Sequence, residues 1–357
     1  MDRSPILFRC DGNNRVGWEA TYQCLTYAAA LQRRRRVSHF LSQIEPFPLI
    51  AQVARGGNEY IAAAHPAGSP EDCDETIRII RKLGVAAVVV AAPGVTTDYL
   101  RELSSTGVLV AVIDSEAAVR FPTKLVFNPL LGIEARKYEH ERGTQLCLGE
   151  RYALVRSVFR RQRSLRPLDP QGPYRALIAL GDDDFGGHSL IRTRELLAAS
   201  RVEKITVMVR SHHHEHDELK ALAEEHKARL EVLTETSELS TRLPRAHFAI
   251  TSGDGWSLEM ACVGIPQFVM THDKRHVACA TRLEEEGAGL YLGAADGVSE
   301  LTLREAVNHL LDDQLERVGM ARCARYLVDG RGPDRMVNAI EVMLHPAILA
   351  GQLRIAA

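Results

Sequence analysis

Two glycine-containing loops carry the residue types of a phosphate-binding site. The first, Thr251–Glu259, reads Thr-Ser-Gly-Asp-Gly-Trp-Ser-Leu-Glu and lies between an apolar run and a predicted helix. Glycines let backbone N–H groups approach an anion, and the N-terminus of a helix favours negative charge. We therefore expect ligand contacts from Gly253, Gly255, Ser257 and Glu259, with the glycines near phosphate and the glutamate near ribose hydroxyls. The alternative is an ordinary strand-to-helix turn with a capping carboxylate, since such turns are often rich in glycine.

The second loop is Gly181–Ser189, Gly-Asp-Asp-Asp-Phe-Gly-Gly-His-Ser, which also lies between a predicted strand and a predicted helix. Its amides at Gly186 and Gly187 are candidate contacts to a nucleotide diphosphate. Three consecutive aspartates would repel phosphates unless they face away or bind a cation. A solvated loop in which one aspartate caps the turn is an equally good interpretation.

A long polar turn, Asp11–Gln23, offers side chains for proton transfer. It follows the first predicted strand, and loops at this position commonly carry substrate contacts. Its titratable candidates for a catalytic role are Asp11, Glu19 and Tyr22. The alternative is that Glu19 and Gln23 only solvate the start of a helix.

Two further clusters are better explained without a ligand. The tract His212–Asp217 contains four histidines, but consecutive loop residues point in different directions and no metal-binding helical spacing is present. We expect no metal ion and no other cofactor. The run Arg33–Arg36 ends a predicted helix, where cations complement the helix dipole, and it lacks the interleaved aromatic residues of a nucleic-acid site.

The elements that position these loops alternate between short apolar strands and amphipathic helices. The predicted strands are Ile6–Cys10, Ser38–Ser42, Ala86–Ala91, Leu109–Asp114, Leu125–Asn128, Arg175–Leu180, Lys204–Val209, Leu230–Leu233, Phe248–Thr251 and Gln267–Met270. Predicted helices include Thr21–Arg33, Glu71–Leu83, His188–Ala199, Asp217–Lys227 and Arg275–Glu286. Continuous apolar strands separated by helices indicate α/β architecture, with parallel sheets covered on both faces.

A basic, proline-containing stretch divides this pattern into two predicted domains. Residues 160–173, Arg-Arg-Gln-Arg-Ser-Leu-Arg-Pro-Leu-Asp-Pro-Gln-Gly-Pro, have no apolar periodicity, which is typical of a linker. We expect one domain over residues 1–159 and a second over residues 174–357. Two open α/β domains facing each other form a cleft, and such sheets bind ligands beyond the carboxyl ends of their strands.

Composition excludes several classes of protein. The 357 residues are 45% hydrophobic and 25% charged with a formal net charge of −2, so disordered, fibrous and strongly basic nucleic-acid-binding classes are disfavoured. We expect no nucleic-acid partner. No apolar run reaches the roughly 20 residues of a membrane span. The seven cysteines are scattered and odd in number, which favours the reducing cytoplasm over a disulfide framework.

Taken in order, the motifs resemble the UDP-sugar hydrolase of pseudaminic acid biosynthesis and its spore-coat-polysaccharide relatives. These proteins are similar to two-domain GT-B glycosyltransferases, including the peptidoglycan enzyme that makes lipid II. The segments that carry the resemblance in the first half are Phe8–Gly12, Val16-Gly17, Cys24-Leu25, Val112–Ser115, Phe127–Pro129 and Gly149–Arg156. Those in the second half are Gly181–Gly187, Thr251–Glu259, Gly264–Pro266 and Asp329–Val337.

The resemblance implies two Rossmann-like domains facing a cleft, with a uridine nucleotide held at Thr251–Glu259 and Glu259 on the ribose. Three elements of the family pattern differ here. Its Gly-x-Gly-His-x-x-Arg reads Gly17-Trp18-Glu19-Ala20-Thr21-Tyr22-Gln23, its Asp-x-Tyr is absent at Ala91–Pro93, and its Asn-Gln pair falls on Arg275-His276. Alanine cannot transfer a proton as histidine does, so Glu19 becomes the candidate base.

The resulting expectation is an enzyme that acts on a nucleotide-sugar, a UDP-sugar above all, in surface-glycan biosynthesis. It would hydrolyse or transfer at the sugar–nucleotide linkage, with Arg275 or His276 neutralising the diphosphate. Two alternatives remain open at this point: a non-catalytic protein that binds a nucleotide-sugar on the same fold, and a GT-B glycosyltransferase.

Overall fold

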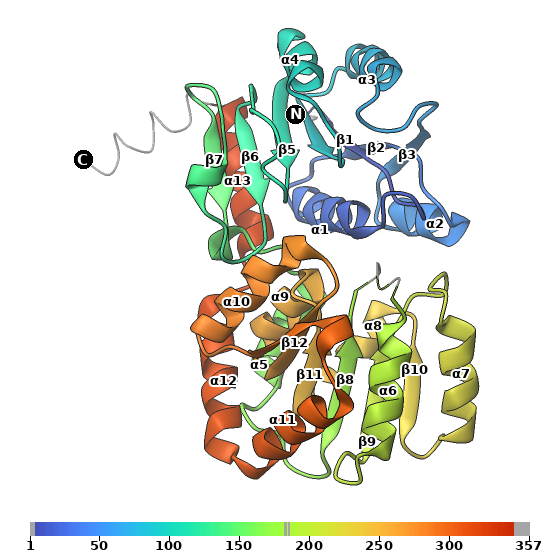
Figure 1. Ribbon diagram of the computed structural model, residues 1–357. Coiled ribbons are helices and arrows are strands. Elements are labelled where there is room, and N and C mark those ends of the chain that lie inside the picture. Colours follow the sequence, from blue (N-terminus) through green and yellow to red (C-terminus); the bar gives the residue numbers. More distant parts are fainter. Residues whose placement is uncertain (1–3, 182–183, 185, 346–357) are drawn as a thin grey trace. The chain divides into compact units, whose positions relative to one another are not determined.

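The computed structural model describes residues 4–181, 184 and 186–345, and the chain forms two compact units (Figure 1). The first unit comprises Met1–Pro129, Ile133–Leu154 and Arg331–Ala357. The second comprises Leu130–Gly132 and Val155–Gly330. No helix in the described ranges is both long and apolar enough to cross a lipid bilayer.

The first unit is built on a parallel sheet that, in the described residues, has seven strands in the order β3-β2-β1-β4-β5-β6-β7. The strands are β1 (Ile6–Cys10), β2 (Ser38–Ser42), β3 (Glu59–Ala62), β4 (Ala87–Ala91), β5 (Leu109–Ile113), β6 (Leu125–Asn128) and β7 (Gln145–Leu148). Helices cover both faces, which is why the central strands are mostly apolar. In β1, Phe8 joins the core on one face and Leu7 joins the core on the other.

The helices of the first unit divide between these two faces. They are α1 (Glu19–Arg33), α2 (Phe47–Arg55), α3 (Pro70–Leu83), α4 (Thr97–Ser105) and α13 (Gly332–Leu344). Helices α1, α2 and α13 supply buried side chains to the core around Phe8, whereas α3 and α4 supply the core around Leu7. Helix α3 begins where the Ser69 hydroxyl accepts the Asp72 N–H, and it ends at Gly84, which has the left-handed backbone that glycine adopts without strain.

Helix α13 brings the end of the chain back to the first unit. Its residues Met336, Val337 and Ile340 are buried beside α1, and the Tyr27 hydroxyl donates to the Met336 carbonyl. The Arg36 guanidinium also donates to both carboxylate oxygens of Glu341. The sequence analysis expected residues 174–357 to form one domain. The structure differs because the apolar face of α13 completes the core of the first unit.

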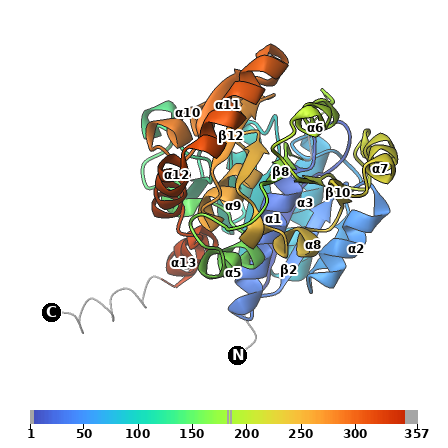
Figure 2. The same cartoon turned by 90° about the horizontal axis from the view of Figure 1, so that it is seen from below.

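The second unit contains a parallel sheet of six described strands in the order β10-β9-β8-β11-β12-β13. Its strands are β8 (Arg175–Ala179), β9 (Lys204–Met208), β10 (Leu230–Leu233), β11 (Phe248–Thr251), β12 (Gln267–Thr271) and β13 (Leu290–Ala294). Its helices are α5 (Ser157–Leu165), α6 (His188–Ala198), α7 (His216–Glu225), α8 (Thr236–Ser240), α9 (Gly255–Val263), α10 (Val277–Glu285), α11 (Glu300–Asp312) and α12 (Gln314–Leu327). Helices α6 and α8 lie on opposite sides of β8 and β10 (Figure 2).

The segment expected to be a linker, residues 160–173, is packed onto the second unit. Helix α5 runs through its first residues, and the chain passes from the first unit to the second between Leu154 and Val155. The side chain of Arg166 is buried and donates to the carbonyls of Ala246 and Gly264. Arg166 is one of the basic residues that had suggested a linker, and in the structure it binds backbone carbonyls in the interior of the second unit.

Candidate functional site

The two glycine loops meet at the carboxyl ends of the strands in the second unit. Strands β8 and β11 are neighbours, and β12 follows β11 in the sheet, so the loops after these three strands lie side by side. A Cβ atom added at Gly181 would come within 2.7 Å of an Asp254 carboxylate oxygen, and one added at Gly253 within 2.9 Å of the His276 carbonyl oxygen. Both glycines also have positive φ. The close packing of these loops therefore requires glycine at both positions.

The start of helix α9 is already capped by the protein. The Asp254 carboxylate accepts hydrogen bonds from the N–H groups of Trp256 and Ser257, and the Gly253 N–H donates to the Ser257 hydroxyl. We expected the amide of Gly253 to lie near phosphate and Ser257 to contact the ligand. The structure engages both in the turn, and a capping carboxylate occupies the positive end of the helix. Only open space surrounds a Cβ added at Gly255.

The second loop has the same capped geometry. The Asp184 carboxylate accepts hydrogen bonds from the N–H groups of His188 and Ser189 at the start of α6, and from the Ser189 hydroxyl. Gly187 has φ +73°, and a Cβ there would lie 2.7 Å from the Glu215 carboxylate. Asp184 therefore faces the helix and not the solvent, which removes one of the three expected phosphate-repelling charges. The other two aspartates of the loop, at positions 182 and 183, lie outside the described residues.

Three histidines, which the sequence analysis did not single out as a group, line this edge. The ring centroids of His188 and His272 are 6.5 Å apart, and those of His272 and His276 are 6.1 Å apart. Burial and the neighbouring rings of His276 and His188 lower the pKa of His272, although the Asp184 charge opposes them. The rings come from loops after β8 and β12, so their proximity depends on strand order, which single motifs do not reveal.

Glu259 does not present its carboxylate to solvent. The side chain is 3% exposed, and its two oxygens accept hydrogen bonds from the Nε and Nη2 atoms of Arg156 at 2.7 and 2.5 Å. The Arg156 guanidinium lies 4.4 Å from the Trp256 ring centroid and donates to the Thr236 hydroxyl. The structure thus assigns Glu259 to the positioning of Arg156. Arg156 ends the motif Gly149–Arg156, but nothing in the sequence indicated that its partner is Glu259.

The late segment Arg275-His276 divides between the edge and the protein interior. The Arg275 guanidinium pairs with Asp273, with Nη2 2.6 Å from the carboxylate. Burial would raise the pKa of Asp273, but hydrogen bonds from Arg275 outweigh it and lower that pKa to about 2. His276 is buried against Gly253. The expectation that either residue neutralises a diphosphate stays a prediction.

In the first unit, Asp11 belongs to a buried ion-pair network. Its Oδ1 accepts a hydrogen bond from Arg9 at 2.6 Å, and the backbone N–H groups of Gln43 and Ala67 also donate to its carboxylate. Arg9 Nε lies 2.5 Å from the Asp72 carboxylate. Through these contacts the Asp11 carboxylate connects its own loop to the loops that contain Gln43 and Ala67. The catalytic role expected for it is not supported by this geometry.

Glu19 and Tyr22 lie at the start of α1. Glu19 is the first residue of the helix, where a carboxylate complements the dipole, and it accepts a hydrogen bond from the Gln23 side chain at 3.1 Å. Tyr22 is partly buried and packs against the core of the first unit. The helix-solvating alternative for Glu19 and Gln23 is therefore seen in the structure, and a catalytic role for either Glu19 or Tyr22 stays a prediction.

The histidine tract contributes to a buried cluster. Ligand atoms of Asp184, His213 and Glu215 lie within 4.8 Å of one another, a separation and set of residue types that could hold a metal ion. The same groups have protein partners, however. His213 Nδ1 accepts the Glu215 N–H at 3.2 Å, and the Glu215 carboxylate accepts the Leu190 N–H at 3.1 Å. The expectation that this tract holds no metal ion stays a prediction.

Glu215 should make the second unit less stable as pH rises. Burial, together with the charges of Asp184 and Glu218, raises the pKa of Glu215 to about 7. The unfolded chain ionises this group near pH 4.5, so the folded state binds more protons between about pH 4.5 and 7, and stability falls across that interval. Glu215→Gln should therefore raise the free energy of unfolding by about 2–3 kcal/mol at pH 8.

Thermal unfolding at pH 5 and pH 8 measures this effect. The wild-type protein should lose more stability between the two values than the variant does. The exposed Glu225→Gln change on the same helix is the matched control and should leave the pH dependence as it is. Parallel pH profiles for wild type and Glu215→Gln would contradict the prediction.

Comparisons with known proteins agree with this fold. No family model matches the chain. The chain is 25% identical over 221 residues to the spore coat polysaccharide biosynthesis protein SpsG of Bacillus subtilis (strain 168), covering 60% of this chain and 64% of that protein. The chain thus spans less than two thirds of the length of this relative.

Solved structures resemble the whole chain at low sequence identity. MurG of Acinetobacter baumannii matches with a TM-score of 0.63 and 15% identity, over 95% of this chain and 99% of that one. The rhamnosyltransferase SpnG complexed with thymidine diphosphate matches with a TM-score of 0.64 and 16% identity, over 94% of this chain and 100% of that one. The S. aureus MnaA–UDP structure matches with a TM-score of 0.61 and 12% identity, over 96% of this chain and 97% of that one. The chain therefore has two parallel-sheet α/β units of the GT-B type, as the motifs implied.

Proposed function

We propose that this chain binds a nucleotide-sugar at the carboxyl edge of the second unit and processes its sugar–nucleotide linkage in surface-glycan biosynthesis. The observation that supports this is the convergence of the loops after β8, β11 and β12, where two tight glycine turns and the rings of His188, His272 and His276 lie together. Open α/β sheets bind ligands at this edge. The SpnG and MnaA structures, which share the fold, were solved with thymidine diphosphate and UDP.

The histidines supply the chemistry that the capped helices do not. With Asp184 and Asp254 at the helix starts, phosphate oxygens need other donors, and an imidazole ring can donate an N–H hydrogen bond. Burial lowers the pKa of His272, and a bound diphosphate would favour the protonated form of this ring, so nucleotide affinity should rise as pH falls. Hydrolysis and transfer are both compatible with this proposal, and they differ only in whether the acceptor is water or a glycan hydroxyl.

A second candidate, a nucleotide-sugar-binding protein without turnover, rests on Ala20. This residue stands where the hydrolase family that the sequence resembles has its histidine. Binding of UDP without release of UDP from any UDP-sugar would favour it. Release of free UDP would favour hydrolysis, and a glycosylated product would favour transfer.

The test of the binding site is His272→Ala. Removing one phosphate donor should weaken UDP binding about tenfold, as measured by calorimetry. His309→Ala is the control, because His309 is exposed on α11 and should leave affinity unchanged. The absence of binding to UDP, TDP, GDP and ADP in the wild-type protein would refute the proposed function.

A further inference from the structure

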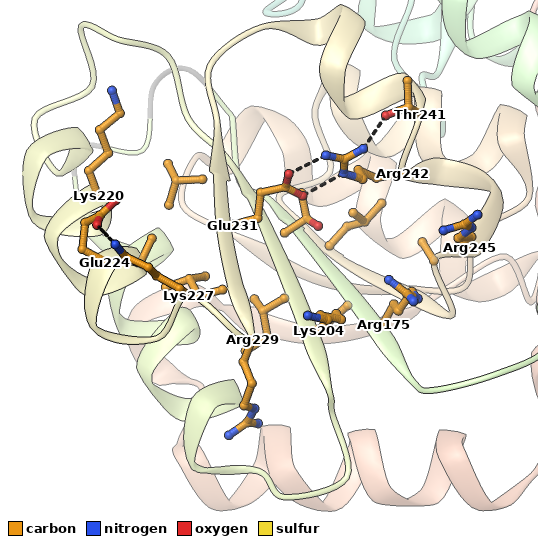
Figure 3. Close-up of a pocket in the computed structure, with 18 of the residues that line it drawn as sticks. Arg175, Lys204, Lys220, Glu224, Lys227, Arg229, Glu231, Thr241, Arg242 and Arg245 are labelled. Carbon is orange, nitrogen blue, oxygen red and sulfur yellow. Dashed lines mark hydrogen bonds and ion pairs between the residues drawn. The ribbon is translucent and has the colours of Figure 1, made fainter.

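A strongly basic cavity lies at the amino-terminal ends of β8 and β9 and beside β10. It has a volume of about 790 Å³. Strand β10 lines it, together with α7 on one side of that strand and residues 241–246 on the other (Figure 3). Of the described residues that line it, seven are basic and two are acidic: Arg175, Lys204, Lys220, Lys227, Arg229, Arg242 and Arg245 against Glu224 and Glu231. A chain with a net charge of −2 has gathered cations here.

The two acidic residues do not balance these cations. Glu231 accepts two hydrogen bonds from the Arg242 guanidinium, which also donates to the Thr241 hydroxyl, and the bonds from Arg242, against burial, lower the pKa of Glu231. Glu224 pairs with Lys227 at 2.6 Å. The guanidinium of Arg229 is also engaged, because it donates to backbone carbonyls after α6, including that of Ala199 at 2.9 Å.

Two of the cations, Arg175 and Lys204, lie side by side on adjacent strands, and the Lys204 ammonium also donates to the Ala228 carbonyl. Arg175 and Lys204 are Cα partners in register at the first positions of β8 and β9, about 4.8 Å apart. Like charges in this arrangement destabilise a sheet. Among the described residues, neither the Arg175 nor the Arg245 side chain has a carboxylate partner. An anion placed between Arg175 and Arg245 would accept hydrogen bonds from both guanidinium groups. Its negative charge would also reduce the repulsion between Arg175 and Lys204.

We propose that this cavity binds a phosphate-type anion with at least two negative charges. Arginine forks match phosphate oxygens in pairs, and the cavity volume lies in the range of small-ligand sites. Arg175, Lys204 and Arg245 provide the charges, and the apolar side chains of Leu177 and Ile205 line the cavity beside them. The site is separate from the proposed nucleotide site, which lies at the carboxyl ends of β8, β11 and β12. The phosphate belongs either to a soluble polyphosphorylated metabolite or to the head group of an anionic lipid.

Calorimetry with inorganic tripolyphosphate and flotation with vesicles test the proposal on the full chain. The vesicles contain phosphatidylcholine alone or phosphatidylcholine with phosphatidate. Arg175→Gln/Arg245→Gln should weaken binding at least about tenfold, and added salt should weaken wild-type binding. Arg78→Gln/Arg81→Gln removes the same charge from exposed positions of α3 and should change nothing. The His272→Ala variant should also bind as the wild type does.

The two ligand sources give different results. Tripolyphosphate binding that depends on Arg175 and Arg245 assigns a soluble ligand, and binding only to phosphatidate vesicles with the same dependence assigns a lipid head group. Binding of neither probe, or equal binding by wild type and the double variant, overturns the proposal. Because the substitutions relieve like-charge repulsion, the melting temperature of the variant without anion should equal or exceed that of the wild type. Should the double variant fail to fold, Arg245→Gln alone tests the site, since this exposed residue carries no structural contact among those described.

Discussion

Replacing Arg9 by Met should lower the free energy of unfolding of the first unit by about 3–5 kcal/mol. The Arg9 side chain is fully buried in β1, and it donates to the carboxylates of Asp72 and Asp11 and to the carbonyls of Leu41 and His65. Its removal leaves two buried carboxylates without their cation. Such a loss costs far more than the pair contributed, because the remaining charges are still desolvated.

Urea unfolding followed in the first unit measures this loss. Arg101→Met is the control, since Arg101 forms an exposed pair with Asp98 on α4 and should change stability by less than about 1 kcal/mol. A loss below about 1 kcal/mol at neutral pH would show that the network relaxes, contrary to our expectation.

The largest kinetic effect is expected from Glu19→Gln. If the proposed function includes Glu19 as general base, this change should lower turnover of a nucleotide-sugar by roughly 10²–10⁴-fold, with little change in nucleotide affinity. The substitution is well matched to its purpose, because the amide oxygen that replaces a carboxylate oxygen can still accept the hydrogen bond that Gln23 now donates to Glu19. Loss of the carboxylate at the helix start should cost under about 1 kcal/mol of stability.

Two further variants separate the base from the helix start. Gln23→Ala removes the hydrogen bond but keeps the carboxylate, so turnover should stay close to that of the wild type. Glu19→Gly with Ala20→His restores the pattern of the resembling hydrolases, and a gain of UDP-sugar hydrolysis would show that the remaining pocket is competent. Full activity in Glu19→Gln would end the assignment of Glu19 as base and leave it as a residue that solvates α1.

All the central strands and the edge strand β10 were predicted, and the strands missed from the sequence are β3, β7 and β13. Each of these three lies at the edge of its sheet. An edge strand is covered less than a central one, so it does not need a continuous apolar run; Glu59 and Ala62 of β3 are exposed. Helix α13 was assigned to the second domain although it packs in the first unit. Its apolar face indicates that the helix is buried, but it does not indicate in which of the two cores.

The candidate site was predictable in place but not in detail. Strand–loop–helix order identified the loops at Gly181 and Gly253, since ligand edges follow from sheet topology. The sequence could not show whether Asp254 faces solvent or caps α9, because that depends on one side-chain torsion. It also could not show that Glu259 meets Arg156, which is 103 positions away in the chain. Local spacing predicts local geometry, whereas these contacts depend on the tertiary fold.

The return of α13 to the first unit has a consequence for synthesis of the protein. Met336, Val337 and Ile340 fill the core beside α1, yet residues 155–330 are made between the strands of that core and the helix that covers it. At translation rates of about 5–20 residues per second, the nascent first unit waits roughly 10–40 s with part of its apolar face uncovered. The second unit, nearly continuous in sequence, can close before it. The half of the protein that leaves the ribosome first is therefore the half that finishes folding last, and it is the half exposed to chaperones and to aggregation.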